Sequence, residues 1–306
     1  MAGLKEIKNK IKSVQKTRKV TRAMEAVSAV KMRKSQERAR GARTYARSAL
    51  RILGQVSHIV EFAKHPLVAQ NTTGTTVTIL VTSDKGLAGS LNSAVIKLAE
   101  KFIANKDESK GGVKWICIGR RGLDWAERRG YEVIHSVSNV SDDVEEVEMQ
   151  DITDMIIKMQ EQSKVRKVNV IYTNFKSTFE QEAVLRRILP LSHGALNDIV
   201  SGILPERGKW SAGGNEDETR VADYKVEPNR NSLLEEVLPR LTNILVFHTL
   251  LENKASEHSA RMVAMKNATD KAGEVSMLLK RKFNKARQAA ITAEIGEITS
   301  GLEAMK

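Results

Sequence analysis

The sequence predicts an α/β protein in which an antiparallel two-helix coiled coil, formed by both ends of the chain, joins a central α/β domain with a mainly parallel sheet. Two observations predict this fold. Both ends carry long helical patterns with almost no proline, and neither can bury its own apolar stripe. Strand and helix patterns alternate between them. We expect an N-terminal coiled-coil helix at 1–65, a central α/β domain at 75–228 and a C-terminal coiled-coil helix at 232–304.

The N-terminal helix follows a heptad frame, in which apolar or small residues recur at alternating steps of three and four. The residues on this frame are Leu4, Ile7, Ile11, Val14, Met32, Ser35, Ala39, Ala42, Ala46, Ala49, Leu53, Val56 and Val60. Between Val14 and Met32 the frame falls on Arg18, Thr21, Glu25 and Ser28, and apolar side chains come one place earlier, at Val20, Met24 and Val27. We therefore expect the buried stripe to swing around the helix here. The cause is either a packing irregularity or a partner outside the helix pair.

The C-terminal helix has a longer frame with no Lys, Arg, Asp or Glu on it. Its members are Leu241, Ile244, His248, Leu251, Ala255, His258, Met262, Met265, Thr269, Ala272, Ser276, Leu279, Phe283, Ala286, Ala290 and Ala293. Many of them are small, which lets a second helix approach closely. Pro239 is expected to kink this helix or delay its start. His248 and His258 are expected to be packed histidines.

The middle of the chain predicts a Rossmann-like domain. Strands are expected at 76–82, 114–119, 131–137 and 167–173, and helices at 91–105, 123–129 and 144–162. This alternating order predicts a parallel sheet with both faces covered. Edge strands are expected at 182–190 and 220–226, and a polar exposed loop at 205–219.

The C-terminal helix is expected to outrun its partner. Helices that both leave one domain and pack together are antiparallel. The second has 73 residues against 60. At 1.5 Å per residue, the surplus projects about 20 Å past the N-terminus. This overhang carries an apolar stripe without a partner in the chain, formed by Ile291, Ile295, Ile298 and Leu302. We expect it to sit inside another protein.

The charge of the chain lies on its first helix. The net charge is +13, and residues 1–60 alone hold 16 Lys or Arg against 3 Asp or Glu. This excess predicts an acidic partner: nucleic acid, anionic lipid or an acidic protein surface. A coiled-coil protein that binds nucleic acid through its basic helix is the alternative function. Against it, basic residues share the helix with an apolar seam, and Tyr45 is the one aromatic in residues 1–60.

Few residues suggest catalysis, and no catalytic, cofactor or metal site is expected. The turn Thr82–Asn92 follows a strand and precedes a helix, where phosphates bind, but it matches no phosphate-loop fingerprint. A structural or partner-contact turn is favoured over a nucleotide site or a nucleotide-binding enzyme. The histidines lack helical metal-site spacing. Cys117 is expected to be a buried thiol, and the acidic cluster that begins at Asp142 a solvated helix start.

Several segments resemble the gamma subunits of F-type ATP synthases, bacterial type. They are Ile7–Glu25, Lys31–Gln36, Thr82–Asn92, Glu252–Asn253, Ala255–Asp270 and Asn284–Thr292. They cover both helices and the centre in the family's order. Lys85, Ala88 and Ser90 stand where the family usually has Arg, Cys and Gly. The regulatory cysteine pair of the chloroplast form is absent.

The resemblance implies a central-stalk rotor with no catalytic residues of its own. The coiled coil would turn inside the alpha3-beta3 ring, and the central domain would bind the epsilon subunit and the membrane c-ring. The complex would lie at the cytoplasmic face of the bacterial plasma membrane as a peripheral assembly. Proton and sodium coupling are not distinguished. The implied contacts with beta or alpha subunits are Lys19, Arg22, Met24, Lys31, Arg33, Lys85, Ala88, Arg261, Gln288, Thr292 and Glu294. The stripe from Ile291 to Leu302 would be an apolar bearing.

Overall fold

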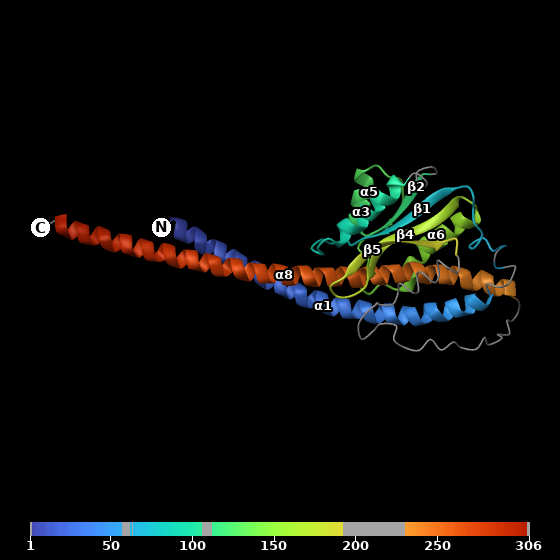
Figure 1. Cartoon of the computed structure of the whole chain (residues 1–306), viewed down its shortest axis with the longest axis horizontal. Coiled ribbons are helices and arrows are strands. Elements are labelled where there is room, and N and C mark those ends of the chain that lie inside the picture. Colours follow the sequence, from blue (N-terminus) through green and yellow to red (C-terminus); the bar gives the residue numbers. More distant parts are fainter. Residues whose placement is uncertain (1, 57–61, 63, 106–111, 192–229, 305–306) are drawn as a thin grey trace. The chain divides into compact units, whose positions relative to one another are not determined.

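Two long helices and a five-stranded sheet make up the computed structural model of this protein (Figure 1). It describes all residues except 1, 57–61, 63, 106–111, 192–229 and 305–306. The chain divides into two compact units. One contains residues 1–28 and 261–306, and the other contains residues 29–260. Helix α1 (Ala2–Val56) and helix α8 (Arg230–Ala304) each contribute to both units.

The sheet of the larger unit is mixed, with four parallel strands and one antiparallel edge strand. Its order is β3-β2-β1-β4-β5. The strands are β1 (Thr75–Val81), β2 (Val113–Ile118), β3 (Val133–Val137), β4 (Val165–Phe175) and β5 (Gln181–Leu189). Strand β5 runs antiparallel to β4 because the connection between them is only a short turn, which permits a hairpin and no crossover. The predicted fold class is confirmed: the terminal helices pack on each other, and the central sheet is mostly parallel.

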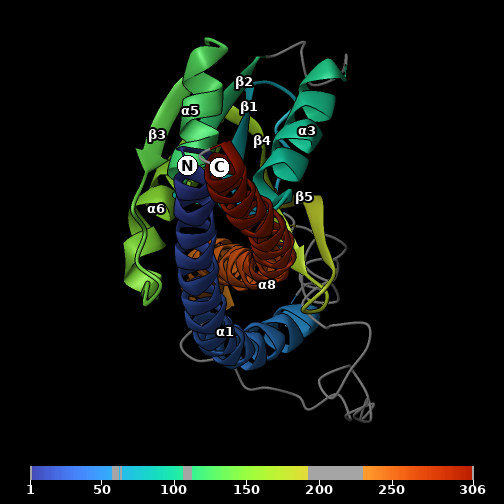
Figure 2. The ribbon, with the colours of Figure 1, turned by 90° about the vertical axis from the view of Figure 1, so that its left-hand side faces the viewer.

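Helices cover both faces of this sheet. Helices α3 (Leu91–Ala104) and α5 (Arg120–Arg128) share one apolar core with the sheet. The short helix η1 (Glu146–Met149), α6 (Gln150–Glu161) and the first part of α8 share the other. Figure 2 shows α3 and α5 on the side of the sheet away from the first part of α8. Because both faces of the sheet are buried, the inner strands are nearly continuous runs of apolar residues.

Strand β2 shows how side chains alternate between the two cores. Trp115 and Cys117 face α3 and α5, whereas Ile116 and Ile118 face α6 and α8. Trp115 packs edge-on against Trp125, with ring centroids 5.4 Å apart. The expected burial of Cys117 is confirmed, and burial raises the pKa of its thiol to about 12. At neutral pH this thiol is protonated and unreactive.

The smaller unit is the coiled coil, and its buried seam runs through Thr21 and Ser28. Thr21 and Ser28 are only 8% and 3% exposed, whereas Val20 and Val27 are 50% and 54% exposed. The expectation that the buried stripe swings to the valines is therefore wrong. Thr21 can occupy the seam because its hydroxyl group finds a partner across it: Thr269 Oγ1 donates to Thr21 Oγ1 at 2.7 Å.

The seam of α8 is small as well as polar. Gly273 and Ser276 are buried there, and the guanidinium of Arg18 lies over Gly273. A Cβ added at Gly273 would lie 3.5 Å from Arg18 Cζ, which is ordinary van der Waals contact.

Replacing Gly273 with alanine is therefore expected to stabilise the coiled coil. Glycine in a helix interior costs about 0.8–1 kcal/mol relative to alanine, and the space beside Arg18 accepts a methyl group. Circular dichroism of the full chain during heating should show the helical signal lost at a higher temperature. A Gly273→Leu variant is the control, because its longer side chain must displace Arg18 and should lower that temperature. Destabilisation by alanine would contradict the prediction.

The last described residues of α8 are exposed. Every residue from Ile291 to Ser300 is exposed, including Ile295 and Ile298. The C-terminal end of α8 extends past the N-terminal end of α1 (Figure 1). The apolar stripe of the overhang is thus solvent-exposed, as expected. The side chain of Leu302 lies outside the described residues.

Other sequence expectations have mixed outcomes. Helix α8 runs through Pro239, so this proline does not delay the start of the helix. Helix α5 begins at Arg120, three residues earlier than expected. The loop at 205–219 and the edge strand at 220–226 lie outside the described residues. The side chains of the α1 frame positions from Ala39 to Val60 also lie outside the described residues.

Candidate functional site

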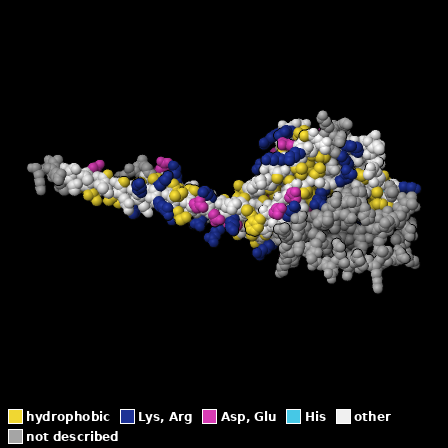
Figure 3. Space-filling model, viewed as in Figure 1, with side chains coloured by type: hydrophobic (Ala, Val, Ile, Leu, Met, Phe, Trp, Pro, Cys, Tyr) yellow, Lys and Arg dark blue, Asp and Glu magenta, His cyan; other side chains and the backbone are white. Residues whose placement is uncertain are grey.

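The outer face of the coiled coil combines positive charge with exposed apolar side chains. Lys19 and Arg22 are exposed, Met24 is half-buried, and Val20 and Val27 lie two turns apart on the same helix. Figure 3 shows Lys and Arg side chains interspersed with hydrophobic ones along this rod. Such a face suits an acidic partner surface that also offers apolar contacts.

The polar positions of α8 differ in exposure. Arg261 is buried, whereas Gln288, Thr292 and Glu294 are exposed near the open end of the rod. Thr292 Oγ1 donates to the Gln288 carbonyl oxygen at 3.0 Å, so its hydroxyl group is engaged with its own helix. Gln288 and Glu294 present free surface, but Arg261 does not.

The turn between β1 and α3 is held rigidly. Ser83 N donates to Asn92 Oδ1 at 3.0 Å, and Asn92 Nδ2 donates to Ser83 Oγ at 2.7 Å. The turn forces Leu87 into the left-handed region, with φ of 63°, and leaves its side chain exposed. Holding a leucine there costs of order 1–3 kcal/mol and is typical of functional turns. Lys85 is also exposed, whereas Ala88 is 2% exposed and therefore packs inward.

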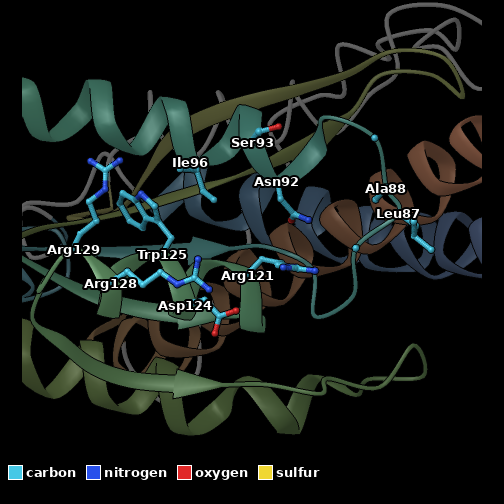
Figure 4. Close-up of a pocket in the computed structure, with 12 residues that line it drawn as sticks. Leu87, Ala88, Asn92, Ser93, Ile96, Arg121, Asp124, Trp125, Arg128 and Arg129 are labelled. Carbon is cyan, nitrogen blue, oxygen red and sulfur yellow. The ribbon is translucent and has the colours of Figure 1, made fainter.

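A cleft of about 540 Å³ opens beside this turn, between α3 and α5 (Figure 4). Arg121 and Arg128 line it from α5, with Asp124 between them. Arg128 follows Arg121 by seven positions, about two helical turns, so they lie on one helix face about 10 Å apart along the axis. Arg121 is the nearer of the two to the turn, where Lys85 is also exposed. No pair of groups in the cleft has the arrangement of a nucleophile and its base.

A second charged cluster joins a loop of the larger unit to both helices. Lys31 Nζ of α1 donates to Asp142 Oδ2 at 2.5 Å. His258 Nε2 of α8 lies 2.9 Å from Asp142 Oδ1. Lys254 Nζ lies 3.8 Å from the same Oδ1. An ionised carboxylate only accepts, so His258 Nε2 carries the hydrogen of this bond. His258 is buried as expected, but it is not merely packed.

The environment of Asp142 keeps it ionised. The hydrogen bond from His258 lowers its pKa most, and the bond from Lys31 and the charges of His258 and Lys254 lower it further, against the opposing effect of burial. The acidic cluster was expected to be solvated. That holds for Glu145 and Glu148, which form a capping box at η1, but not for half-buried Asp142.

Asp142 is expected to make the free energy of unfolding depend on pH in the acid range. Its pKa in the folded state is depressed, so its stabilisation is fully present above the unfolded-state pKa of about 3.9. The stabilisation is lost as the pH falls from there through the folded-state pKa. Thermal unfolding of the wild type and of Asp142→Asn should differ at pH 7, and the gap should narrow below pH of about 4. A gap of constant size across this range would contradict the prediction.

Sequence reasoning found the parts of these surfaces but not their grouping. It named Lys31 and Arg33 as outward contacts, yet Lys31 is bound to Asp142 while Arg33 is exposed. It did not name Arg121 or Arg128. The only available signal was the pattern of basic pairs at both ends of α5. No spacing in the sequence links Asp142 to His258, 116 residues away.

Known proteins are similar in sequence to this chain over its whole length. The ATP synthase family matches residues 3–305. The ATP synthase gamma chain of Dechloromonas aromatica is 37% identical over 305 residues, and that of Polaromonas naphthalenivorans is 38% identical over 305 residues. In both cases the whole of each chain is covered. The chain belongs to the ATP synthase gamma family.

Solved structures share the fold of this gamma-family chain. One is a mitochondrial ATP synthase from Euglena gracilis in rotational state 3, with a TM-score of 0.65, 15% identity, and coverage of 99% of this chain and 95% of that one. Another is the central stalk and c-ring of a Tetrahymena thermophila mitochondrial ATP synthase, with a TM-score of 0.55, 22% identity, and coverage of 81% and 99%. The family match and the two bacterial relatives confirm the resemblance read from the sequence.

The described part of this gamma-family chain has neither a candidate membrane-spanning helix nor a candidate metal-binding cluster. Over the part of the chain that the structure describes, no helix is both long and apolar enough to cross a membrane. Within the same residues, His, Cys, Asp and Glu do not gather in groups of three that could hold a metal ion.

Proposed function

We propose that this protein is the central-stalk rotor subunit of an F-type ATP synthase. It couples rotation of a membrane c-ring, driven by proton flow, to ATP synthesis or hydrolysis at the beta subunits. The observation that carries the proposal is full-length membership of the gamma family in a chain whose coiled coil ends in a bare apolar overhang. Catalysis belongs to the partner subunits, and this chain supplies mechanical coupling.

An asymmetric rod can act on three catalytic sites in turn. It presents a different face to each beta subunit, and each face stabilises a different open or closed state. A ligand or partner shifts such an equilibrium only by its differential affinity for the two states. The face with Lys19, Arg22, Val20 and Val27 offers both charge and apolar contact for this purpose. The cationic cleft with Arg121 and Arg128 is a second surface suited to an acidic part of the ring.

The overhang is suited to turn within an apolar collar. Ile291, Ile295 and Ile298 offer dispersion and hydrophobic contact, which has no preferred direction. Fixed polar bonds would have to break at every step, and each costs free energy to leave unmade. Thr292 and Thr299 fit this role, because their hydroxyl groups bond to their own helix.

The larger unit is proposed to bind the epsilon subunit and the c-ring. This would attach the chain peripherally to the cytoplasmic face of the bacterial plasma membrane, as one copy per complex. Basic residues on the rod remain compatible with the alternative of a coiled-coil nucleic-acid-binding protein.

Co-purification separates these two functions. The chain, tagged at its N-terminus and expressed in its own cells, is isolated with mild detergent, and its companions are identified by mass spectrometry. The rotor requires alpha, beta, epsilon and c subunits in fixed stoichiometry and ATPase activity that follows the tag. Recovery of nucleic acid without these subunits would overturn the proposal. A nuclease-treated sample is the control.

The overhang is expected to become ordered only in the ring. Its residues 291–300 are exposed in the free chain, so their backbone hydrogen bonds should open readily. Hydrogen exchange at these residues should slow at least about tenfold when the chain is assembled with alpha and beta subunits. Residues of β1 serve as the internal control. Equal protection in the free and assembled chain would contradict the expectation.

A further inference from the structure

The loop that connects β3 to η1, residues 138–145, binds α1 and α8 through two adjacent carboxylates. Asp142 bonds to Lys31 on one helix and to His258 on the other. Asp143 Oδ1 lies 2.9 Å from Arg38 Nη2 and 3.3 Å from Lys34 Nζ, both on α1. Lys31, Lys34 and Arg38 follow a spacing of three and four, so one face of α1 meets the loop.

The other end of the loop is fastened to the sheet. Asp84, which follows β1, accepts from the backbone N of Asn139 at 2.9 Å and of Arg120 at 3.0 Å through the same Oδ1 atom. The Val140 carbonyl accepts from Lys254 Nζ of α8 at 2.8 Å. Residues 138–145, which we call the strap, are therefore held at one end by the sheet and at the other by both helices.

The two helices depend on this strap to different degrees. Helix α8 is also held by apolar side chains such as Leu241, Leu245 and Leu250, which are buried in the sheet core. In residues 29–38 of α1, the only buried side chains are those of Met32 and Ser35. The contacts of Asp142 and Asp143 therefore carry much of what fixes this part of α1.

We propose that Asp142 is the positioning residue that locks α1 against α8 and the sheet, so that torque reaching the sheet domain enters both helices together. This inference rests on the proposed rotor function. Without the contacts of Asp142, torque would move α1 relative to α8, while ATP hydrolysis by the ring continued. The predicted defect is therefore in coupling and not in catalysis.

The first experiment tests the clamp in the isolated full chain. Asp142→Asn keeps the shape of the side chain and removes the charge that three cationic or hydrogen-donating groups share. Hydrogen exchange at residues 29–38 should rise about tenfold, with residues 91–104 of α3 unchanged. Asp151→Asn, an exposed carboxylate in the first turn of α6, is the matched control and should change neither segment. Unchanged exchange at residues 29–38 in Asp142→Asn would overturn the inference.

The second experiment tests the role of the clamp in the assembled complex in membrane vesicles. Asp142→Asn should retain ATP hydrolysis measured with an uncoupler, but should pump at least about threefold fewer protons per ATP, because slippage dissipates work. The double variant Lys31→Cys and Asp142→Cys, bridged by a reducible bis-thiosulfonate linker, should recover the wild-type ratio and lose it again on reduction. Cys117 is buried, so the linker does not modify it.

The outcomes of the two experiments are distinguishable. Raised exchange with an unchanged proton-to-ATP ratio would show that Asp142 does not transmit torque. Loss of coupling that the linker fails to restore would also count against it. Failure of the wild-type chain to assemble with ATPase subunits would instead overturn the proposed function, and the exchange experiment would still decide whether the clamp exists.

Discussion

Replacing Gly119 with alanine is expected to leave little of the sheet domain folded. Gly119 lies between β2 and α5, with φ of 96°, a region that alanine rarely adopts. A Cβ there would lie 2.2 Å from the Thr82 carbonyl oxygen and 2.7 Å from its carbonyl carbon. Both are backbone atoms of the neighbouring strand end, so no side chain can rotate away. The strands must separate, and we expect a loss of about 4 kcal/mol or more.

Urea denaturation followed by tryptophan fluorescence measures this effect, because Trp115 and Trp125 lie in the core beside the change. Gly130→Ala is the matched control. Gly130 also has a positive φ, of 69°, but a Cβ there meets nothing within 4 Å. It should lose only about 1 kcal/mol, the cost of the backbone conformation alone. Equal losses in the two variants would show that the contact with Thr82 is unimportant.

Reversing the charge of Lys19 and Arg22 together is expected to slow ATP turnover in the assembled complex about tenfold. The double Glu variant replaces attraction to an acidic surface with repulsion, and like charges brought together at an interface cost several kcal/mol before relaxation and screening. Both side chains are exposed in the chain itself, so the free protein should fold normally. Steady-state ATP hydrolysis and ATP synthesis by reconstituted complexes measure the effect.

A second double variant controls for net charge. Lys158→Glu with Lys164→Glu changes the total charge equally, and both residues are exposed on the sheet domain. It should leave turnover within about twofold of wild type. The defect of the Lys19 and Arg22 variant should grow at low ionic strength, because screening weakens there. Wild-type turnover and synthesis by this variant would refute the electrostatic contact.

Local periodicity predicted most of the fold because the strands and helices bury regular faces. The α8 frame is buried or half-buried from Leu241 to Ala290. The same reasoning failed at Thr21 and Ser28 in α1. It assumed that the seam follows the larger apolar side chains. Instead, small hydroxyl side chains are buried there, and that of Thr21 bonds to Thr269 across the seam.

The functional surfaces were harder to predict because they depend on distant segments. The coiled-coil candidates could be named from one helix. The cleft required knowing that α3 and α5 lie on the same face of the sheet. The cluster around Asp142 joins three segments, with Lys31 and His258 each more than 100 residues away. Pattern within one element carries no information on such pairs.

The small seam side chains also set how thick the rod is. Helices that meet through Thr21, Ser28, Gly273 and Ser276 can approach to the low end of the usual 8–10 Å between helix axes. In the rotor we propose, the force that the rod exerts on its surroundings equals the torque divided by its radius. A slender rod therefore pushes harder on the subunits around it than a stout one delivering the same torque.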